Sequence, residues 1–437
     1  MSFRNIAGTS PSTRQRLLTI LVASALVAGV GAVLRFGCVG RACEEPVSAT
    51  ADVPFCGLPS SVRDRIVAGF RDGRSPDVMA VARSEVHGGT AFESGSGPAW
   101  PTTSETPETL PLMFSGTGVA EGASLPEGVT FDRIAPTVAE IIGLERQHPE
   151  VRSGTALPNI ASGVPPRLVV LVALLGVGGD DLEPVADGAY SATADPGTQP
   201  LDPAALLATI GTGGLPRQHG ITGTLLRDDR GRLVKAWSRR SPISVIATLG
   251  DDLDESTRQR ARIGLVAPDI SHQGLIGGNW YIDNDRDDIV LAEPGDEVSA
   301  ARRVLGDGYG QGGAVDLLGV VLDVPAWDLP RQLTALQREA RRVSGDSALF
   351  VVAGLGSETM TGASAAEIED SLEVELGADV VEATTPGGLF IDQQVLADRG
   401  LSEDRILAAL GRLTDAAGNK VFADVFTSIA VSFERYC

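Results

Sequence analysis

The chain has 437 residues, 43% of them hydrophobic, and a formal net charge of −21. This length suffices for one large α/β domain or two smaller ones, and the apolar content suffices for a sizeable core. The negative charge argues against nucleic-acid binding, because a phosphate backbone is bound by a basic face.

The first feature along the chain is an apolar run over residues 17–34, LLTILVASALVAGVGAVL, without a single charge. About 18 helical residues at 1.5 Å each nearly span a bilayer core. Arginines precede the run, which predicts that residues 1–16 are cytoplasmic and that the bulk of the chain is extracytoplasmic. The alternative is a cleaved signal peptide, which would have a shorter apolar region ending in small residues. We expect an uncleaved single-pass anchor in the cell membrane, followed by a linker over 35–55.

Strand-like and helix-like segments follow the linker. The run 167–179, RLVVLVALLGVGG, is apolar on both faces, as a central parallel strand must be. The other predicted strands are 76–83, 109–116, 241–249, 261–267, 315–323, 347–355 and 378–384, and the predicted helices are 60–73, 131–144, 251–261, 329–343 and 401–413. Apolar strands alternating with amphipathic helices predict an α/β fold whose doubly wound, mostly parallel sheet is flanked by helices.

No G-x-S-x-G elbow and no P-loop occurs, but six segments together resemble a known family. They are TGGLPRQHGITG (212–223), RLVVLVALLGVGG (167–179), VVLDVPAWD (320–328), LFVVAGLGSE (349–358), EVHGGT (85–90) and the stretch 111–154. The first resembles the T-G-x-x-P-x-x-H-G-I turn of the nucleotide pyrophosphatase/phosphodiesterase branch of the alkaline phosphatase superfamily. The others resemble its first strand, its ligand-bearing strands and loop, and its closing segment.

The order of these segments is not the family's order. Residues 56–155 resemble the closing segment, yet they precede residues 165–437, which resemble the opening and middle segments. The resemblance therefore implies a single, circularly permuted domain over 56–437, in which the two N-terminal strands join the same sheet as 167–175. Permutation is physically cheap, because the termini of a domain often lie close together on its surface.

Four cysteines follow the apolar run: Cys38, Cys43, Cys56 and Cys437. An even number of cysteines on the non-cytoplasmic side predicts disulfides. A zinc site is not predicted, because none of the cysteines lies in a C-x-x-C motif or a Cys/His cluster. The permutation implied by the resemblance places Cys437 beside Cys43 or Cys56. If Cys437 pairs with Cys56, Cys38 and Cys43 are left to close a small local loop.

The family's enzymes use two metal ions, usually zinc, held by three Asp and three His, and a Thr or Ser nucleophile. By the resemblance, Asp323 and His87 keep two of the six ligand positions. The lost positions are Leu175, Trp327, Gly354 and Leu355. The place of the nucleophile falls at Pro203, and the nearby Thr198 and Thr209 do not follow the family's spacing.

A leucine cannot bind a metal, and two leftover ligands cannot hold two ions. We therefore expect a catalytically inactive relative with a binding or scaffolding role in the cell envelope. We expect no cofactor, a membrane contact through 17–34, no nucleic acid, and an envelope or membrane protein as partner. The alternative is an active phosphodiesterase or nucleotide pyrophosphatase with a rebuilt site that holds zinc or another divalent metal.

The permutation hypothesis makes a geometric prediction about these positions. His87, Asp323, Leu175, Pro203, Gly354 and Leu355 should converge on one cleft at the carboxyl ends of the strands. The wall of that cleft should be apolar, formed by Leu175, Leu355 and Trp327. Asp323 should have a hydrogen-bond partner there, for which we propose His87 itself.

Overall fold

The computed structural model describes residues 54–83, 100–105, 108–179, 182, 188–278, 280–281, 286–323, 325, 327–356, 365–415 and 418–437. These residues belong to one compact unit, Val53–Cys437. The apolar run 17–34, Cys38, Cys43 and His87 lie outside the described residues, so the predictions made for them stay predictions. Within the described ranges, no helix has the length and hydropathy needed to cross a bilayer.

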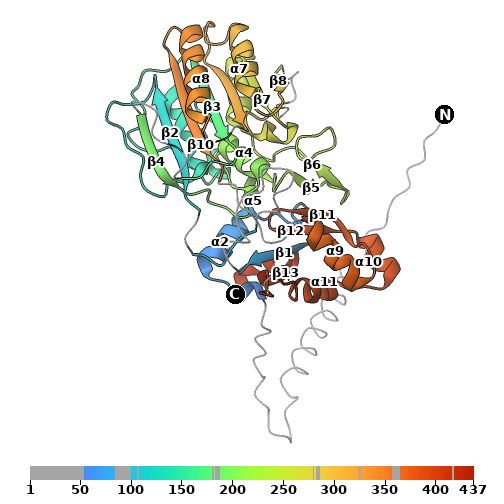
Figure 1. The fold of residues 1–437 in the computed structure, drawn as a ribbon. Helices are drawn as coiled ribbons and strands as arrows, with labels where there is room; N and C mark the ends of the chain where they lie inside the picture. The colour runs from blue at the N-terminus through green and yellow to red at the C-terminus, as the bar shows by residue number, and fades with distance from the viewer. Residues whose placement is uncertain are drawn as a thin grey trace, which may run out of the picture. The chain divides into compact units, whose positions relative to one another are not determined.

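Seven strands form the central sheet, in the order β4-β2-β10-β3-β9-β7-β8 (Figure 1). They are β2 (Leu110–Gly116), β3 (Leu168–Leu174), β4 (Gly188–Ala194), β7 (Ile263–Ala267), β8 (Asp288–Leu291), β9 (Asp316–Leu322) and β10 (Ala348–Gly354). The five strands from β10 to β8 are parallel, whereas β2 and β4 add an antiparallel edge. β3 lies between β9 and β10 and is buried along its whole length, which confirms the central strand predicted from its unbroken apolar run.

Helices cover both faces of this sheet. One face carries α3 (Ile134–Ile142), α4 (Pro203–Thr212) and α6 (Leu249–Thr257), and the other carries α7 (Glu297–Gly306) and α8 (Leu329–Ser344). Val169 and Leu171 of β3 pack with the first set, and Val170 and Val172 pack with the second. Successive strand residues point to opposite faces, so this division defines three layers. The predicted α/β class is confirmed, with a sheet that is mixed and largely parallel.

A second, antiparallel sheet has the order β11-β12-β1-β13. Its strands are β1 (Val78–Ala82), β11 (Val381–Thr385), β12 (Gly388–Ile391) and β13 (Phe422–Thr427). Figure 1 shows the blue N-terminal strand β1 among red C-terminal strands. The prediction that 76–83 joins the central sheet is therefore wrong, although the strand itself exists. Its pattern could not show which sheet it joins, because β1 is buried on both faces.

The remaining helices of this region pack on the second sheet. They are α2 (Ser60–Gly69), α9 (Ala365–Leu376), α10 (Gln393–Arg399), α11 (Glu403–Leu410) and α12 (Ser428–Ser432). Val78 and Ala80 face a core that includes residues of α9, α10 and α11, and Met79 and Val81 face a core that includes residues of α2 and α12. The strand predicted over 378–384 is β11, which likewise belongs to this sheet.

Residues 56–155 do not form a domain with a core of its own. β2 lies inside the central sheet between β10 and β4, and α3 packs in the same core cluster as β3. The N-terminal block is therefore shared between the two sheets.

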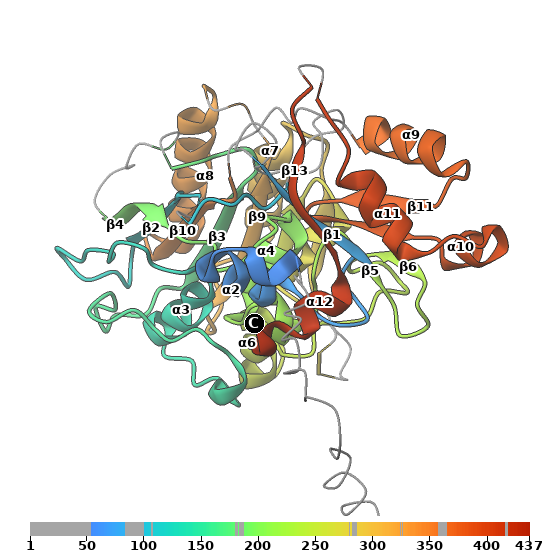
Figure 2. The ribbon, with the colours of Figure 1, turned by 90° about the horizontal axis from the view of Figure 1, so that it is seen from below.

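A disulfide joins the two ends of this unit. Cys56 lies in η1 (Pro54–Gly57) and pairs with Cys437, with 5.2 Å between the Cα atoms and a sequence separation of 381. The ring of Phe55 packs against Phe426 of β13, with centroids 5.0 Å apart. Figure 2 shows the C-terminus beside α2 and α12. The prediction that Cys437 pairs with Cys43 or Cys56 is confirmed for Cys56.

The strand predicted over 241–249 is wrong, because this segment is a loop that leads into α6. Its backbone groups bond outside any sheet: the amide of Val245 donates to the His219 carbonyl at 2.8 Å. Thr248 then caps α6, with its hydroxyl accepting from the Asp251 amide and its own amide donating to the Asp251 carboxylate. The alternation of apolar and polar residues imitates a strand here, but the capping box decides the structure.

Candidate functional site

Three positions singled out from the sequence meet at the carboxyl edge of the central sheet. Leu175, Asp323 and Leu355 directly follow β3, β9 and β10, which are neighbours. The amide of Leu175 donates to the Leu322 carbonyl at 2.9 Å, and the amide of Leu355 donates to the Leu174 carbonyl at 2.9 Å. Ligands of open α/β sheets bind at this edge.

The side chains at this edge belong to the hydrophobic core. Leu175 is 6% exposed and Leu355 is 0% exposed, and both pack in the core cluster of α3, α4 and α6. A Cβ atom on Gly354 would lie 2.5 Å from the Val177 carbonyl oxygen and 2.7 Å from the ring of Pro111. The position therefore has no room for a side chain, least of all for a metal-binding carboxylate.

Trp327 does not line this edge as predicted. Its side chain is 82% exposed, in the turn that precedes α8. The predicted apolar wall consequently holds for Leu175 and Leu355 only. The predicted contact between Asp323 and His87 involves a residue outside the described ranges.

A buried carboxylate that was not predicted from the sequence lies next to Asp323. Glu297 is the first residue of α7, is fully buried, and accepts a hydrogen bond from the Gly295 amide at 2.8 Å. Burial raises the pKa of Glu297, and the nearby charge of Asp323 raises it further, while backbone amides, that of Asp323 included, lower it. The signal in the sequence is the helix start EPGDE, but an acidic residue in a first turn is usually exposed, so this pattern did not point to a site.

Two carboxylates offer oxygen ligands of the kind that divalent cations accept. Tight coordination of Zn²⁺ needs three or four protein ligands. Within the part of the chain that the structure describes, no group of three or more His, Cys, Asp or Glu side chains is placed to hold a metal ion.

The position predicted for the nucleophile, Pro203, lies in the first turn of α4. Pro203 is the first residue of the helix, and Asp202 caps it by accepting from the Ala204 amide at 2.9 Å. The Asp202 carboxylate also accepts from the Thr224 hydroxyl at 3.1 Å, and burial raises its pKa. Proline carries no nucleophilic atom, so this helix start is built as a cap.

The two candidate threonines are buried in the fold. Thr209 donates to the Ala205 carbonyl at 3.0 Å and is bonded to Nε2 of His219 at 3.2 Å. Because Nδ1 of His219 accepts from the Ile221 amide at 3.1 Å, the proton is on Nε2. Burial lowers the pKa of His219 to about 3, so the ring is neutral at pH 7. Thr198 is also fully buried, beneath α2 at Gly69.

The TGGLPRQHGITG turn is thereby explained as a structural element. Its histidine connects α4 to the loop behind it, and no functional group of His219 faces solvent. The short helix α5 (Pro216–His219) ends at Gly220, whose φ of 81° is strained for other residues. The turn therefore positions α4 and the hairpin that follows.

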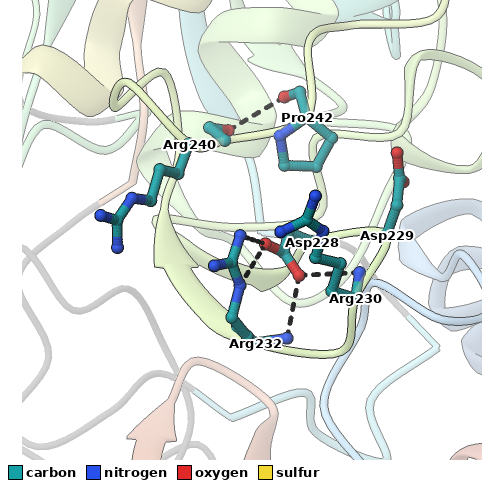
Figure 3. Close-up of a pocket in the computed structure, with 7 residues that line it drawn as sticks. Asp228, Asp229, Arg230, Arg232, Arg240 and Pro242 are labelled. Atoms are coloured by element: carbon teal, nitrogen blue, oxygen red, sulfur yellow. Dashed lines mark hydrogen bonds and ion pairs between the residues drawn. The ribbon is translucent and has the colours of Figure 1, made fainter.

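That hairpin, β5 (Leu225–Arg227) and β6 (Leu233–Lys235), borders a surface hollow of about 490 Å³. Its lining residues are Asp228, Asp229, Arg230, Arg232, Arg240, Ser241 and Pro242 (Figure 3). This hollow was not predictable from the sequence, because its arginines come from a turn and a loop without any known motif.

Comparisons with known proteins return nothing: no protein-family model, no curated protein and no solved structure matches this chain. The resemblance to the alkaline phosphatase superfamily therefore rests on the six sequence segments alone. What that relation implies for function is a proposal.

Proposed function

We propose that this chain is a non-catalytic binding domain with a circularly permuted, phosphodiesterase-like fold. The observation that carries the proposal is the carboxyl edge of the central sheet. Leu175 and Leu355 are packed into the core where the family's enzymes need metal ligands, and Gly354 has no room for one. Hydrocarbon side chains supply no lone pairs to a metal ion.

The nucleophile side of the site supports the same conclusion. Pro203 begins α4 under the Asp202 cap, and the hydroxyl of Thr209 is fully buried and bonded to Ala205 and His219. A nucleophile must reach the substrate and have a base within hydrogen-bond distance. The neutral His219 is the only base bonded to Thr209 in the described structure, and neither group reaches solvent.

The proposed place of action is the extracytoplasmic face of the cell membrane, with 17–34 as the anchor. The disulfide between Cys56 and Cys437 fits an oxidising compartment. An envelope or membrane protein is the proposed partner.

A second candidate function is an active metal-dependent phosphodiesterase with a rebuilt site. One observation favours it: Glu297 adds a carboxylate beside Asp323 that the family pattern does not include. The ligand set would have to be completed by His87 and by Asp180 and Asp181, two acidic residues that directly follow the run 167–179 in the sequence. All three lie outside the described residues.

The two candidates are separated by metal content and by hydrolysis of bis(p-nitrophenyl) phosphate, both measured on the purified full chain in detergent with added zinc. We expect metal far below one ion per chain and a rate equal to that of buffer. Asp323→Asn and Glu297→Gln should change neither value. Stoichiometric zinc, with hydrolysis that disappears in Asp323→Asn, would replace the first proposal by the second.

A further inference from the structure

Positive charge is concentrated around the hairpin of an otherwise acidic chain. Between residues 217 and 240 the sequence has seven basic residues and two acidic ones, a net charge of +5, while the whole chain has −21. The basic residues are Arg217, Arg227, Arg230, Arg232, Lys235, Arg239 and Arg240. Three of these residues are engaged in ion pairs: Arg227 with Asp77 and Glu382, Arg232 with Asp228, and Lys235 with Asp269. The charge of the remaining arginines attracts anions over roughly a Debye length of about 8 Å at physiological salt.

The turn of the hairpin is held by a single carboxylate. Asp228 accepts from the amides of Arg230 and Arg232 at 2.8 and 3.0 Å, and from Nε and Nη2 of the Arg232 side chain. These bonds, the Arg232 side chain first, lower the pKa of Asp228 to about 2. Arg227 closes the same turn by donating to the Gly231 carbonyl at 2.8 Å. The backbone that presents Arg230 is thereby fixed before any ligand arrives.

The hairpin is also fixed at its base by Arg227. Its guanidinium donates to Asp77 at 2.7 Å and to Glu382 at 3.0 Å, and it lies over the ring of Phe390, 5.3 Å from the centroid. These three residues belong to the second sheet or its entry. A platform held on two sides loses little conformational entropy on binding a ligand.

Two arginines at the hollow are not used by the fold. Among the described residues, neither Arg230 nor Arg240 has a hydrogen-bond or ion-pair partner for its guanidinium. In Figure 3 no dashed line reaches either guanidinium, whereas that of Arg232 is joined to Asp228. Both residues are exposed. A planar guanidinium fork matches the oxygens of phosphate and carries its charge at any physiological pH.

We infer that the hollow beside β5 and β6 binds a phosphate-bearing anion with at least two negative charges, held mainly by Arg230 and Arg240. A hollow of about 490 Å³ has space for a group of several phosphates. The inference rests on the proposed binding role and names the ligand class for it. The hollow is separate from the carboxyl edge of the central sheet.

The test is titration of the full chain, in phosphatidylcholine nanodiscs, with inorganic tripolyphosphate at low salt. We expect saturable binding that weakens at least tenfold in the double variant Arg230→Gln/Arg240→Gln and that weakens as salt is added. The matched control is Arg338→Gln/Arg405→Gln, which removes the same charge from two exposed helix positions and should change the affinity by less than threefold.

Three results would overturn the inference: no saturable binding by the wild type, equal affinity in the hollow variant, or equal loss in the control. Hydrogen exchange of the central strands confirms that each variant is folded. The anion could come from a lipid headgroup or from a soluble phosphate, and nanodiscs that contain phosphatidylglycerol distinguish these two sources. If such nanodiscs weaken tripolyphosphate binding only when Arg230 and Arg240 are both present, lipid headgroups fill the hollow. If they do not weaken it, a soluble phosphate is the ligand.

The outcome is distinguishable from failure of the proposed function. Zinc-dependent hydrolysis would overturn the non-catalytic role and leave the hollow intact. Absence of tripolyphosphate binding would overturn the hollow and leave the metal and activity results unchanged.

Discussion

The two sheets of this protein are assembled from different parts of the chain. In the central sheet, β3, β9 and β10 come from the middle of the sequence and are buried on both faces. In the second sheet, β1 pairs with β12 and β13, so that Val78 lies beside Leu389 and Thr427. A sheet closed by such distant pairs carries a high entropic cost of closure, and a covalent link between the ends offsets part of it.

The largest effect is therefore expected from the disulfide. Cys437→Ser should lower the free energy of opening of the second sheet by about 2–4 kcal/mol, because without the link the two ends of the chain regain conformational entropy when this sheet opens. Hydrogen exchange should show the loss in β1 and β13, with much smaller changes in β3, β9 and β10.

The matched control is Cys56→Ser, which should have the same effect, and the double variant should be no worse than either single variant. Equal loss of hydrogen-exchange protection in both sheets would contradict this prediction, since it would show that the two sheets open as one unit.

Lowering the pH should destabilise the contacts between the region of the central sheet and the region of the second sheet. Arg71, which follows α2, donates to the carbonyls of Arg217 and Gln218 beside the buried His219. The unfolded chain binds a proton at His219 below about pH 6.5, whereas the native ring does so only near pH 3, so stability falls as the pH falls through this window. The loss from His219 between pH 7 and pH 5 should be about 2 kcal/mol.

This prediction is checked by hydrogen exchange at a series of pH values. His219→Gln should flatten the profile, apart from the share of His272, whose pKa burial lowers to about 4. A His219→Gln profile as steep as that of the wild type would contradict the assignment.

The smallest effect concerns the ion pairs that join the hairpin to the second sheet. Arg227→Gln should cost about 1–2 kcal/mol, because hydrogen bonds to Asp77 and Glu382 are lost in a half-buried setting. Arg412→Gln removes an exposed pair with Glu375 inside the second region and should cost less than about 0.5 kcal/mol. The stability losses of the two variants are ranked by thermal denaturation that is monitored by hydrogen exchange. A larger loss in Arg412→Gln than in Arg227→Gln would show that the hairpin is not anchored through Arg227.

Sequence reasoning succeeded where burial alone decides the structure. β3, β9 and β10 are apolar along their length, and only a strand buried on both faces explains that pattern. It failed for 241–249, where hydrogen bonds to Ser244 and Thr248 outweigh the strand-like alternation. It also failed to assign β1 to its sheet, since the partners of a strand depend on segments more than 300 residues away.

The candidate site was predictable only in part. The positions of Leu175, Asp323 and Leu355 follow from adjacent strands once β3, β9 and β10 are placed. Glu297 and the hollow were not predictable, because each depends on a side chain from one element meeting a neighbour from another. Helix starts and arginine-containing turns are common in sequences, so the sequence does not show which of them forms such a tertiary contact.

The disulfide also determines how the molecule would carry mechanical load. A pulling force applied at Cys56 and Cys437 runs through two Cβ–S bonds and one S–S bond, since these residues are linked directly. The chain between them, across a sequence separation of 381, is bypassed and bears no tension. In a domain tethered through its N-terminal side and pulled at its last residue, both sheets would stay folded until the sulfur link is reduced.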